Sequence, residues 1–239
     1  MSVKADRQIP KSENHQIFFG ALGDIHGAFD VARQIVAKHP EIPFWLCVGD
    51  LATDDGRYEP VGAPVYWIHG NNDNFDAIAS GDLPRDLQHI PNGTLVEIAG
   101  LRVAGLGGTF APTWYDTPAS DLPHPRKGSA KATELADKRR HFVREEVEGC
   151  KSLRDADVLM THEAASPFRP FPGGRGPDAG KRQVNEVLAA MRPRLHLFGH
   201  HHRFSDEIRE GVRSVGLDLV SRGYLLIDAG SLDIPRETL

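Results

Sequence analysis

The sequence has little cysteine, with only Cys47 and Cys150 among its 239 residues. Cys47 lies in the apolar run 44–48, where a buried and unreactive thiol is the expected state. Two isolated cysteines do not make the disulfide framework on which small secreted proteins depend. We therefore expect a reducing environment and predict that the protein is cytoplasmic.

The sequence also lacks a long hydrophobic run. No apolar stretch approaches the roughly 18 residues that a membrane-spanning helix needs, so we expect no membrane partner. Residues 1–14 are polar, without the apolar core of a signal peptide, and we predict that they form a flexible tail. The remaining residues, 15–239, have a length common among one-domain α/β proteins, and we predict a single domain.

An excess of basic charge is missing as well. The chain has 28 Lys and Arg against 33 Asp and Glu, a formal net charge of −5. Proteins that bind nucleic acid usually carry a basic surface, so this balance disfavours a nucleic-acid partner, although a local patch would be compatible with it. What the chain does have is histidine: 12 residues, three of them consecutive at 200–202.

Short apolar runs recur along the chain, and each leads into residues that can bind metals. We interpret them as strands buried on both faces; they are 17–22, 44–48, 65–68, 158–160 and 195–198. Helices are expected between them, at 29–38, at 130–147 and after Pro177. A hairpin at 95–106 and two strands at 212–215 and 224–227 add mixed pairing, so we predict an α/β fold.

Two proline-rich stretches, 111–129 and 166–180, read as long loops, which are usually functional or mobile. Arg169 and Arg175 in the second loop are candidates for binding substrate phosphate, although a solvated loop without such a role is the alternative. The basic run 138–140 has acidic residues on both sides, and we interpret it as the solvated face of a helix.

Polar residues with metal-ligand chemistry follow the predicted strands, whose ends are expected to converge on one crevice. These candidates are Asp24, His26, Asp50, Asn71, His162, His200 and His202. Any one of them alone could be a turn, cap or structural residue. Together they offer carboxylate, imidazole and amide groups, which suit Mn²⁺, Fe or Zn²⁺ better than Mg²⁺ alone. Two ions about 3.5–4 Å apart could hold a bridging hydroxide and clamp a phosphate.

The motifs GDIHG at 23–27, GD at 49–50, GNND at 70–73, TH at 161–162 and GHHH at 199–202 resemble those of the calcineurin-like metallophosphoesterases. The resemblance covers about residues 16–231. It implies a four-layer α/β/β/α sandwich with two mixed β-sheets and with the metals at one sheet edge.

The resemblance also implies how the ligands divide between two divalent ions. The first ion would bind Asp24, His26 and His202. The second would bind Asn71, His162 and His200. Asp50 would bridge the two ions, and His201 is given no role. We expect Mn²⁺, with Fe, Zn²⁺ or Ni²⁺ as alternatives.

The chain departs from the family pattern at Asn72. Many members have Gly-Asn-His followed by Asp or Glu, with the histidine contacting phosphate or protonating the leaving group. An asparagine side chain can only hydrogen-bond, so we predict a substrate contact at Asn72 without proton transfer, and Asp73 loses its usual partner. Asn72 and Asp50 are the predicted catalytic residues. The sequence resembles the bacterial and archaeal branch of the family that has a non-histidine at this position, and this resemblance implies a phosphodiesterase of small activated substrates.

We therefore predict a hydrolase of small phosphoesters, most of all phosphodiesters of small molecules or nucleotides, that uses a metal-bridging hydroxide. The alternatives are a phosphomonoesterase or protein phosphatase, a nuclease, or a metal-stabilised scaffold without catalysis. No oligomeric state is predicted.

Overall fold

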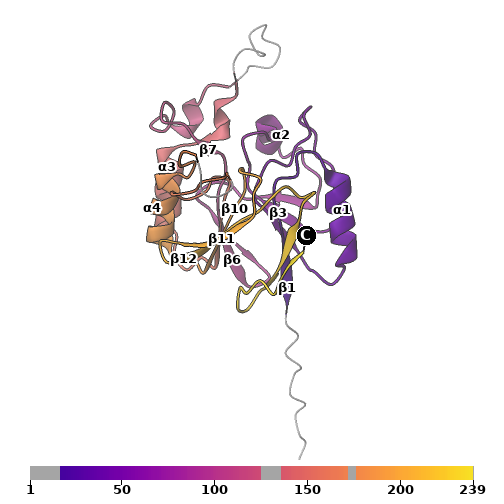
Figure 1. Ribbon diagram of the computed structural model, residues 1–239. Coiled ribbons are helices and arrows are strands. Elements are labelled where there is room, and N and C mark those ends of the chain that lie inside the picture. Colours follow the sequence, from indigo (N-terminus) through magenta and orange to yellow (C-terminus); the bar gives the residue numbers. More distant parts are fainter. Residues whose placement is uncertain (1–16, 125–135, 172–175, 239) are drawn as a thin grey trace, which may run out of the picture.

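The computed structural model describes residues 17–124, 136–171 and 176–238 (Figure 1). The predicted tail at 1–14 and the domain start at residue 15 lie outside these ranges. Among the described helices, none has the length and apolar character needed to cross a membrane.

The first sheet has six strands in the order β14-β13-β1-β2-β3-β4. Their bounds are β1 Phe18–Leu22, β2 Trp45–Cys47, β3 Val65–Trp67, β4 Leu87–His89, β13 Tyr224–Asp228 and β14 Arg236–Thr238. Strands β1 to β4 pair in parallel, whereas β13 pairs antiparallel with both β1 and β14. The sheet is therefore mixed, and helices follow the first and third of its parallel strands along the chain.

The second sheet is also six-stranded, in the order β11-β12-β10-β9-β6-β5. Its strands are β5 Leu95–Ile98, β6 Leu101–Leu106, β9 Val158–Thr161, β10 Leu195–Phe198, β11 Ser205–Arg209 and β12 Val212–Gly216. The four central strands are parallel, and the predicted hairpin of β5 and β6 forms one antiparallel edge. A short third ladder pairs β7, Thr109–Phe110, with β8, His141–Phe142.

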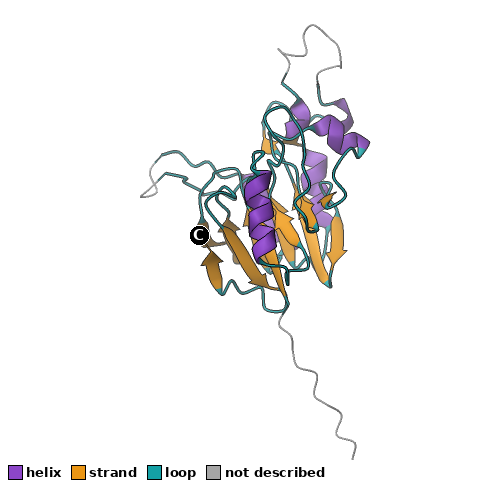
Figure 2. Cartoon of the chain, turned by 90° about the vertical axis from the view of Figure 1, so that its right-hand side faces the viewer, coloured by secondary structure: helices purple, strands orange, loops and turns teal. Residues whose placement is uncertain are grey.

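Alternation along the strands creates three layers of core. In β1, Phe19 and Ala21 belong to the cluster shared by the two sheets, whereas Leu22 packs in the cluster with helix α1, Phe29–Lys38. A third cluster joins the outer face of the second sheet to helices α3, Arg144–Ser152, and α4, Arg182–Met191. Figures 1 and 2 show α1 on one side of the paired sheets, and Figure 1 shows α3 and α4 on the other. The predicted four-layer α/β/β/α sandwich is confirmed.

The helices cover the outer faces because their apolar residues lie on one side. Their bounds are α1 Phe29–Lys38, α2 Phe75–Ser80, α3 Arg144–Ser152 and α4 Arg182–Met191. Helix α1 matches the predicted range, and its buried residues are Phe29, Ala32, Ile35 and Val36. In α4 the buried positions are Val184, Val187, Leu188 and Met191.

Within the described residues, the predicted helix at 130–147 is wrong over 136–143 and right over 144–147, where α3 lies. A 3₁₀ turn, η2, spans Lys138–Arg140, strand β8 follows, and α3 begins only at Arg144. Phe142 is fully buried in the third cluster. Charged composition indicated a helix, but the burial of Phe142 beside β7 keeps this segment extended. A short 3₁₀ turn, η1 at Ala119–Asp121, lies in the described part of the predicted loop at 111–129.

Gly20 limits how closely β1 and β2 pack on the side of α1. It is the register partner of Trp45, and a methyl group at Gly20 would overlap the Trp45 ring. We expect Gly20→Ala to lower the free energy of unfolding by about 1–3 kcal/mol, the usual cost of overpacking, in a urea titration.

Gly149 in α3 provides the matched control, because a methyl group there meets nothing closer than the Cα of Gly93 at 3.5 Å. Gly149→Ala should leave stability unchanged or raise it by up to about 1 kcal/mol. Equal effects of the two substitutions on stability would show that the Trp45 ring does not limit how closely β1 and β2 pack.

Candidate metal centre

Five strands end at one edge of the sandwich, and the candidate ligands lie directly after them. Strand β1 leads to Asp24 and His26, β2 to Asp50, β3 to Asn71, β9 to His162, and β10 to His200 and His202. Because the two sheets pack face to face, the carboxyl ends of their parallel strands meet here. The structure thus brings together all seven residues singled out in the sequence.

Asp24, His26 and His202 form one cluster, with ligand atoms all within 4.8 Å of one another. His202 Nε2 lies 3.0 Å from Asp24 Oδ2. His26 Nε2 lies 3.1 Å from His202 Nε2. Asp24 is 1% exposed, and its carboxylate also accepts the backbone N–H of His200 at 3.0 Å, which ties β1 to the loop after β10.

Asp50, His162 and His200 form the second cluster, with the same 4.8 Å limit between ligand atoms. Asn71 joins it, since its Oδ1 lies 3.2 Å from His162 Nε2. His162 is fully buried, and its Nδ1 lies 2.8 Å from the Val48 carbonyl. A carbonyl can only accept, so Nδ1 carries a proton, and in the neutral form of the ring Nε2 would present its lone pair to the cluster.

The Asp50 carboxylate stands between the two clusters. Its Oδ2 lies 3.6 Å from His26 Nε2 in the first cluster and 3.5 Å from His162 Nε2 in the second. Asp50 is 1% exposed, so this oxygen faces the ligands rather than bulk water. One carboxylate is therefore within reach of both positions at which a cation could sit.

The donor atoms fit divalent cations. Two nitrogens bound to one ion at about 2.0–2.2 Å lie about 3.0–3.4 Å apart, depending on the coordination geometry. The separation of 3.1 Å between His26 Nε2 and His202 Nε2 falls within that range. In the second cluster, His162 Nε2 and Asn71 Oδ1 lie 3.2 Å apart, so both could bind one cation once His162 has lost its Nε2 proton.

Unusual backbone conformations place these side chains. His26, Asp50, His200 and His202 have φ angles of 45°, 50°, 67° and 48°, in the left-handed region that non-glycine residues rarely adopt. Gly49 precedes Asp50 with a φ of 115°, and a Cβ there would lie 2.7 Å from His162 Nδ1. Such conformations cluster at functional sites, where the surrounding structure compensates for their cost.

The Asp50 and His162 side chains hold each other in charged forms when no metal is bound. Burial alone would lower the pKa of His162, but the Asp50 carboxylate raises it to about 10. Burial would likewise raise the pKa of Asp50, but His162 and the N–H groups of Asn72 hold it well below its usual range. Burial, followed by the charge on His162, lowers the pKa of His200 to about 3. Metal binding would therefore displace a proton from His162.

Asn72 contacts the central carboxylate. Its backbone N–H donates to Asp50 Oδ1 at 2.7 Å, and its side-chain amide donates to Asp50 Oδ2 at 2.8 Å. Asn72 also lines the neighbouring cavity. One of the two amide hydrogens is thus used to orient Asp50, and the side chain also reaches the cavity beside it.

Asp73 has a structural role that the sequence did not predict. Its buried carboxylate accepts the backbone N–H groups of Gly70 at 2.7 Å, Leu51 at 2.9 Å, Asp50 at 3.0 Å and Ala52 at 3.1 Å. Burial, followed by the charge of Asp50, raises the pKa of Asp73 to about 6, against the effect of these donors. Asp73 therefore fixes the loop after β2 to the loop after β3. The sequence offered one sign of this role, because a carboxylate three residues after Gly70 can accept the Gly70 N–H within the same turn.

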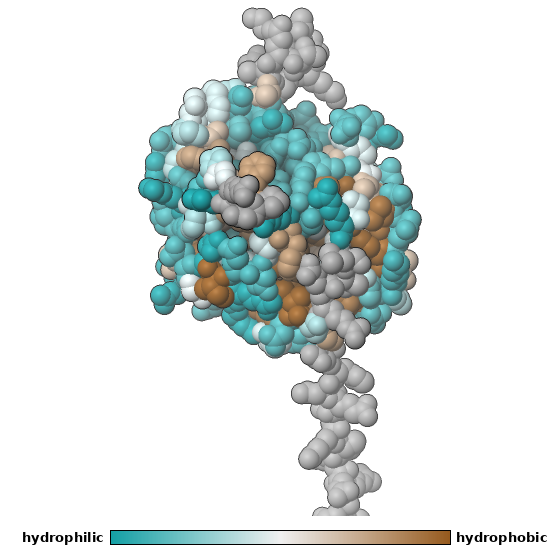
Figure 3. Space-filling model, in the orientation of Figure 1, coloured by the Kyte–Doolittle hydropathy of each residue, from teal (hydrophilic) through white to brown (hydrophobic). Residues whose placement is uncertain are grey.

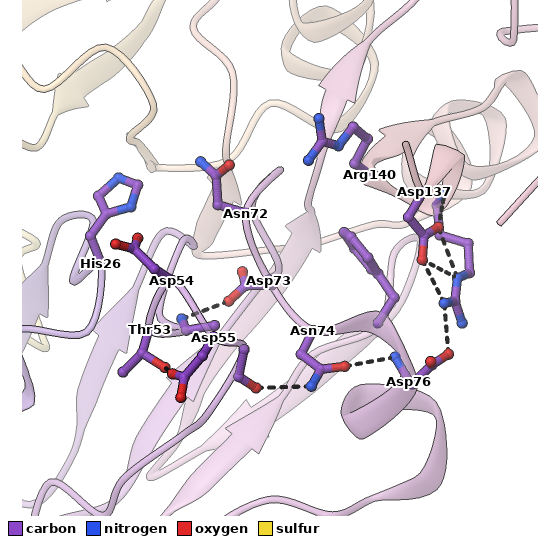
Figure 4. Close-up of a pocket in the computed structure, with 14 residues that line it drawn as sticks. His26, Thr53, Asp54, Asp55, Asn72, Asp73, Asn74, Asp76, Asp137 and Arg140 are labelled. Atoms are coloured by element: carbon purple, nitrogen blue, oxygen red, sulfur yellow. Dashed lines mark hydrogen bonds and ion pairs between the residues drawn. The ribbon is translucent and has the colours of Figure 1, made fainter. Parts of the chain in front are cut away.

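A cavity of about 880 Å³ opens beside the clusters. His26 and Asn72 line it, together with Asp54, Asn74 and Arg140 (Figure 4). The acidic groups and amides of this lining make the cavity polar. Its volume is in the range of small-molecule sites.

Polar residues dominate the face of the molecule that Figure 3 shows, with apolar side chains scattered between them. Single apolar residues on a surface are normal and need no partner. This face therefore gives no sign of a large apolar docking patch that would compete with the cavity as the functional site.

Three further residues were considered in the sequence: Arg169 and Arg175 as phosphate contacts, and His201 as a residue without a role. Arg169 is not among the described residues that line the cavity, and its carbonyl accepts a hydrogen bond from Arg203 at 2.9 Å. Arg175 lies outside the described residues. The His201 ring packs against Phe168 at a centroid distance of 4.7 Å, and its Nε2 lies 3.8 Å from Glu163 Oε2. His201 is therefore a packing residue, in keeping with the absence of a predicted role.

Paired Asp and His clusters at the strand ends of such a sandwich are typical of two-metal hydrolases. The chain belongs to the calcineurin-like phosphoesterase family, whose model matches residues 19–204.

Known relatives extend over most of the chain. An uncharacterised protein of Haemophilus influenzae is 25% identical over 197 residues, which cover 75% of this chain and 81% of that protein. The crystal structure of TT1561 from Thermus thermophilus has a TM-score of 0.63 at 14% identity, covering 92% of this chain and 97% of that one. A putative 5′-nucleotidase from Staphylococcus aureus has a TM-score of 0.53 at 14% identity, covering 94% of this chain and 54% of that one. These structures share the fold.

Replacing Asp73 tests its contribution to the site. Asp73→Asn keeps the volume but turns part of the acceptor into an N–H donor facing backbone N–H groups. We expect a loss of about 2–4 kcal/mol in the free energy of unfolding and weaker metal binding, measured by urea titration and by metal analysis.

Asp76→Asn is the control, because the Asp76 side chain is 71% exposed and bonds only to Arg139 among the described side chains. It should change stability by less than about 1 kcal/mol. A similar small effect of Asp73→Asn would contradict the role assigned to its carboxylate.

Proposed function

We propose that the chain is a two-metal phosphoesterase that hydrolyses small polar phosphodiesters. One observation carries this proposal: a single buried oxygen, Asp50 Oδ2, lies 3.6 Å from His26 Nε2 and 3.5 Å from His162 Nε2, which belong to different clusters. A shared carboxylate is the arrangement that would hold two cations side by side. Membership of the calcineurin-like phosphoesterase family supports the same reaction class.

The residues divide the work as follows. Asp24, His26 and His202 would hold one divalent cation, Asn71, His162 and His200 a second, and Asp50 both. Such ions, with Mn²⁺ favoured, would lower the pKa of a bound water and polarise the phosphoryl oxygens. The Val48 carbonyl keeps the proton of His162 on Nδ1, so that Nε2 stays available. Asn72 holds the Asp50 carboxylate in place through its amide at 2.8 Å.

The cavity supports a small, polar substrate. Its volume of about 880 Å³ can accept a molecule of nucleotide size. Carboxylates and amides line much of it, including those of Asp54 and Asn74. Such walls favour a leaving group with hydroxyl or amino groups over a purely apolar one, because buried polar groups need partners.

Asn72 supports diesters over monoesters in this proposal. Its amide cannot donate a proton to a departing oxygen, and it already donates to Asp50. His69 does not replace it, since its Nδ1 lies 3.2 Å from His89 Nε2 and burial lowers its pKa to about 3. Leaving groups that depart as stabilised anions therefore suit this site.

The first test replaces the shared carboxylate. The wild-type protein with Mn²⁺ should hydrolyse bis(p-nitrophenyl) phosphate, and Asp50→Asn should lower kcat by at least about a thousandfold, because the neutral amide holds two cations poorly. Release of p-nitrophenolate measures the rate, and metal analysis measures occupancy.

Asp116→Asn is the matched control, since the Asp116 side chain is 73% exposed and pairs with Arg144 on the surface. It should retain wild-type activity and metal content. Wild-type turnover by Asp50→Asn would refute the two-metal mechanism, and an inactive, metal-loaded wild type would favour a scaffold.

The second test varies the leaving group. Without a proton donor at Asn72, the rate on aryl phosphodiesters should fall by roughly tenfold or more between p-nitrophenyl and phenyl esters. The p-nitrophenyl diester should also react faster than the p-nitrophenyl monoester. Rates insensitive to the leaving group, or faster monoester hydrolysis, would contradict the diester assignment.

A further inference from the structure

Arg140 reaches the cavity from a segment far from the metal ligands in sequence. It ends η2, and the following β8 pairs in parallel with β7, with Thr109 opposite His141 and Phe110 opposite Phe142. Thr109 Oγ1 also donates to the Arg140 carbonyl at 3.4 Å. Because β7 comes shortly after β6, this ladder carries Arg140 to the edge where the strands of the second sheet end.

One nitrogen of the Arg140 guanidinium is unsatisfied within the described part of the chain. This atom, Nε, is buried and has no hydrogen-bond partner among the described residues. Figure 4 shows the side chain extending over the cavity toward Asn72 and His26. An unsatisfied buried donor costs free energy, so it calls for a partner that the described residues do not supply, such as a water, an ion or a ligand.

The neighbouring basic side chains are engaged elsewhere. Arg139 donates to Asp76 at 2.7 Å and to both oxygens of Asp137, and it lies over the Phe75 ring at 5.7 Å. Lys138 lies over the Trp114 ring at 5.8 Å. Of the basic residues that line the described part of the cavity, Arg139 is neutralised by carboxylates, and Arg140 is left to meet an anion.

We propose that Arg140 binds the non-bridging oxygens of the substrate's phosphoryl group from the side opposite the metal ligands. The planar guanidinium can donate two parallel hydrogen bonds to a phosphate, which a lysine cannot. The metal clusters would hold one side of the phosphoryl group and Arg140 the other. This inference rests on the proposed function. It gives the cavity a residue that recognises the substrate, whereas the sequence predicted only a solvated helix face at 138–140.

The experiment compares Arg140→Gln and Arg140→Lys with Lys138→Gln, which removes the same charge from the same turn. Two quantities are measured on the Mn²⁺-loaded proteins: the Kd of inorganic phosphate by calorimetry, and kcat/KM on bis(p-nitrophenyl) phosphate. Arg140→Gln should weaken phosphate binding and lower kcat/KM by on the order of tenfold to a hundredfold. Arg140→Lys should give values of Kd and kcat/KM between those of Arg140→Gln and the wild type. Lys138→Gln should match the wild type in both.

Stability provides a third measurement. Because Arg140 Nε has no partner to lose among the described residues, the unfolding temperature of Arg140→Gln should equal or exceed that of the wild type. A lowered temperature with unchanged phosphate binding would make Arg140 a structural residue.

The outcomes separate this inference from the proposed function. If the wild type hydrolyses the diester and Arg140→Gln keeps wild-type phosphate affinity and kcat/KM, the Arg140 assignment is overturned while the phosphodiesterase stands. If the wild type binds phosphate through Arg140 but hydrolyses no ester, the proposed reaction fails while the anion site stands. A wild type that binds no phosphate overturns the assignment.

Discussion

The contact on which the site depends is the meeting of the two sheets around the Asp50 carboxylate. His162 from the second sheet lies 3.5 Å from Asp50 Oδ2, and its other ring nitrogen donates to the Val48 carbonyl of the first sheet. A side chain at Gly49 would enter this space, since its Cβ would lie 2.7 Å from the His162 ring. The glycine before the carboxylate is therefore a condition for the sheets to share a ligand set, and the extensive core between the sheets holds them at that distance.

The geometry of the centre has a cost that the rest of the fold offsets. Four of the candidate ligands adopt left-handed backbone conformations, each costing of order 1–3 kcal/mol. Asp73 compensates locally, because its carboxylate accepts backbone N–H groups from both loops that carry Asp50 and Asn71. Without metal, the proton on His162 balances Asp50, whereas a divalent cation would take over that role. The site is thus built by the fold in advance of its ions.

The sequence predicted most of the fold and the position of the ligands, because both depend on local pattern. Buried strands are visible as apolar runs, and a residue directly after a parallel strand can lie only at one sheet edge. The roles of Asp73 and Arg140 depend on contacts with distant segments. Asp73 binds backbone N–H groups some 20 residues earlier, and η2 and β8 replace a predicted helix because Phe142 packs beside β7. The composition near residues 138–140 does not predict the pairing of β7 with β8.

Asn72 and Arg140 together suggest how positive charge is distributed around the cavity. Asn72 is neutral, and its side-chain amide donates a hydrogen bond to Asp50. Asn72 therefore orients the Asp50 carboxylate but adds no positive charge to the cavity. Asp54 adds negative charge to the same cavity, and the carboxylates of Asp76 and Asp137 offset Arg139. In the proposed function, an anionic substrate would depend on the metal ions and on Arg140, which directly precedes β8 of the β7–β8 ladder. Because that ladder is short and lies outside both large sheets, substrate preference could change there without disturbing the strand ends that carry the candidate ligands.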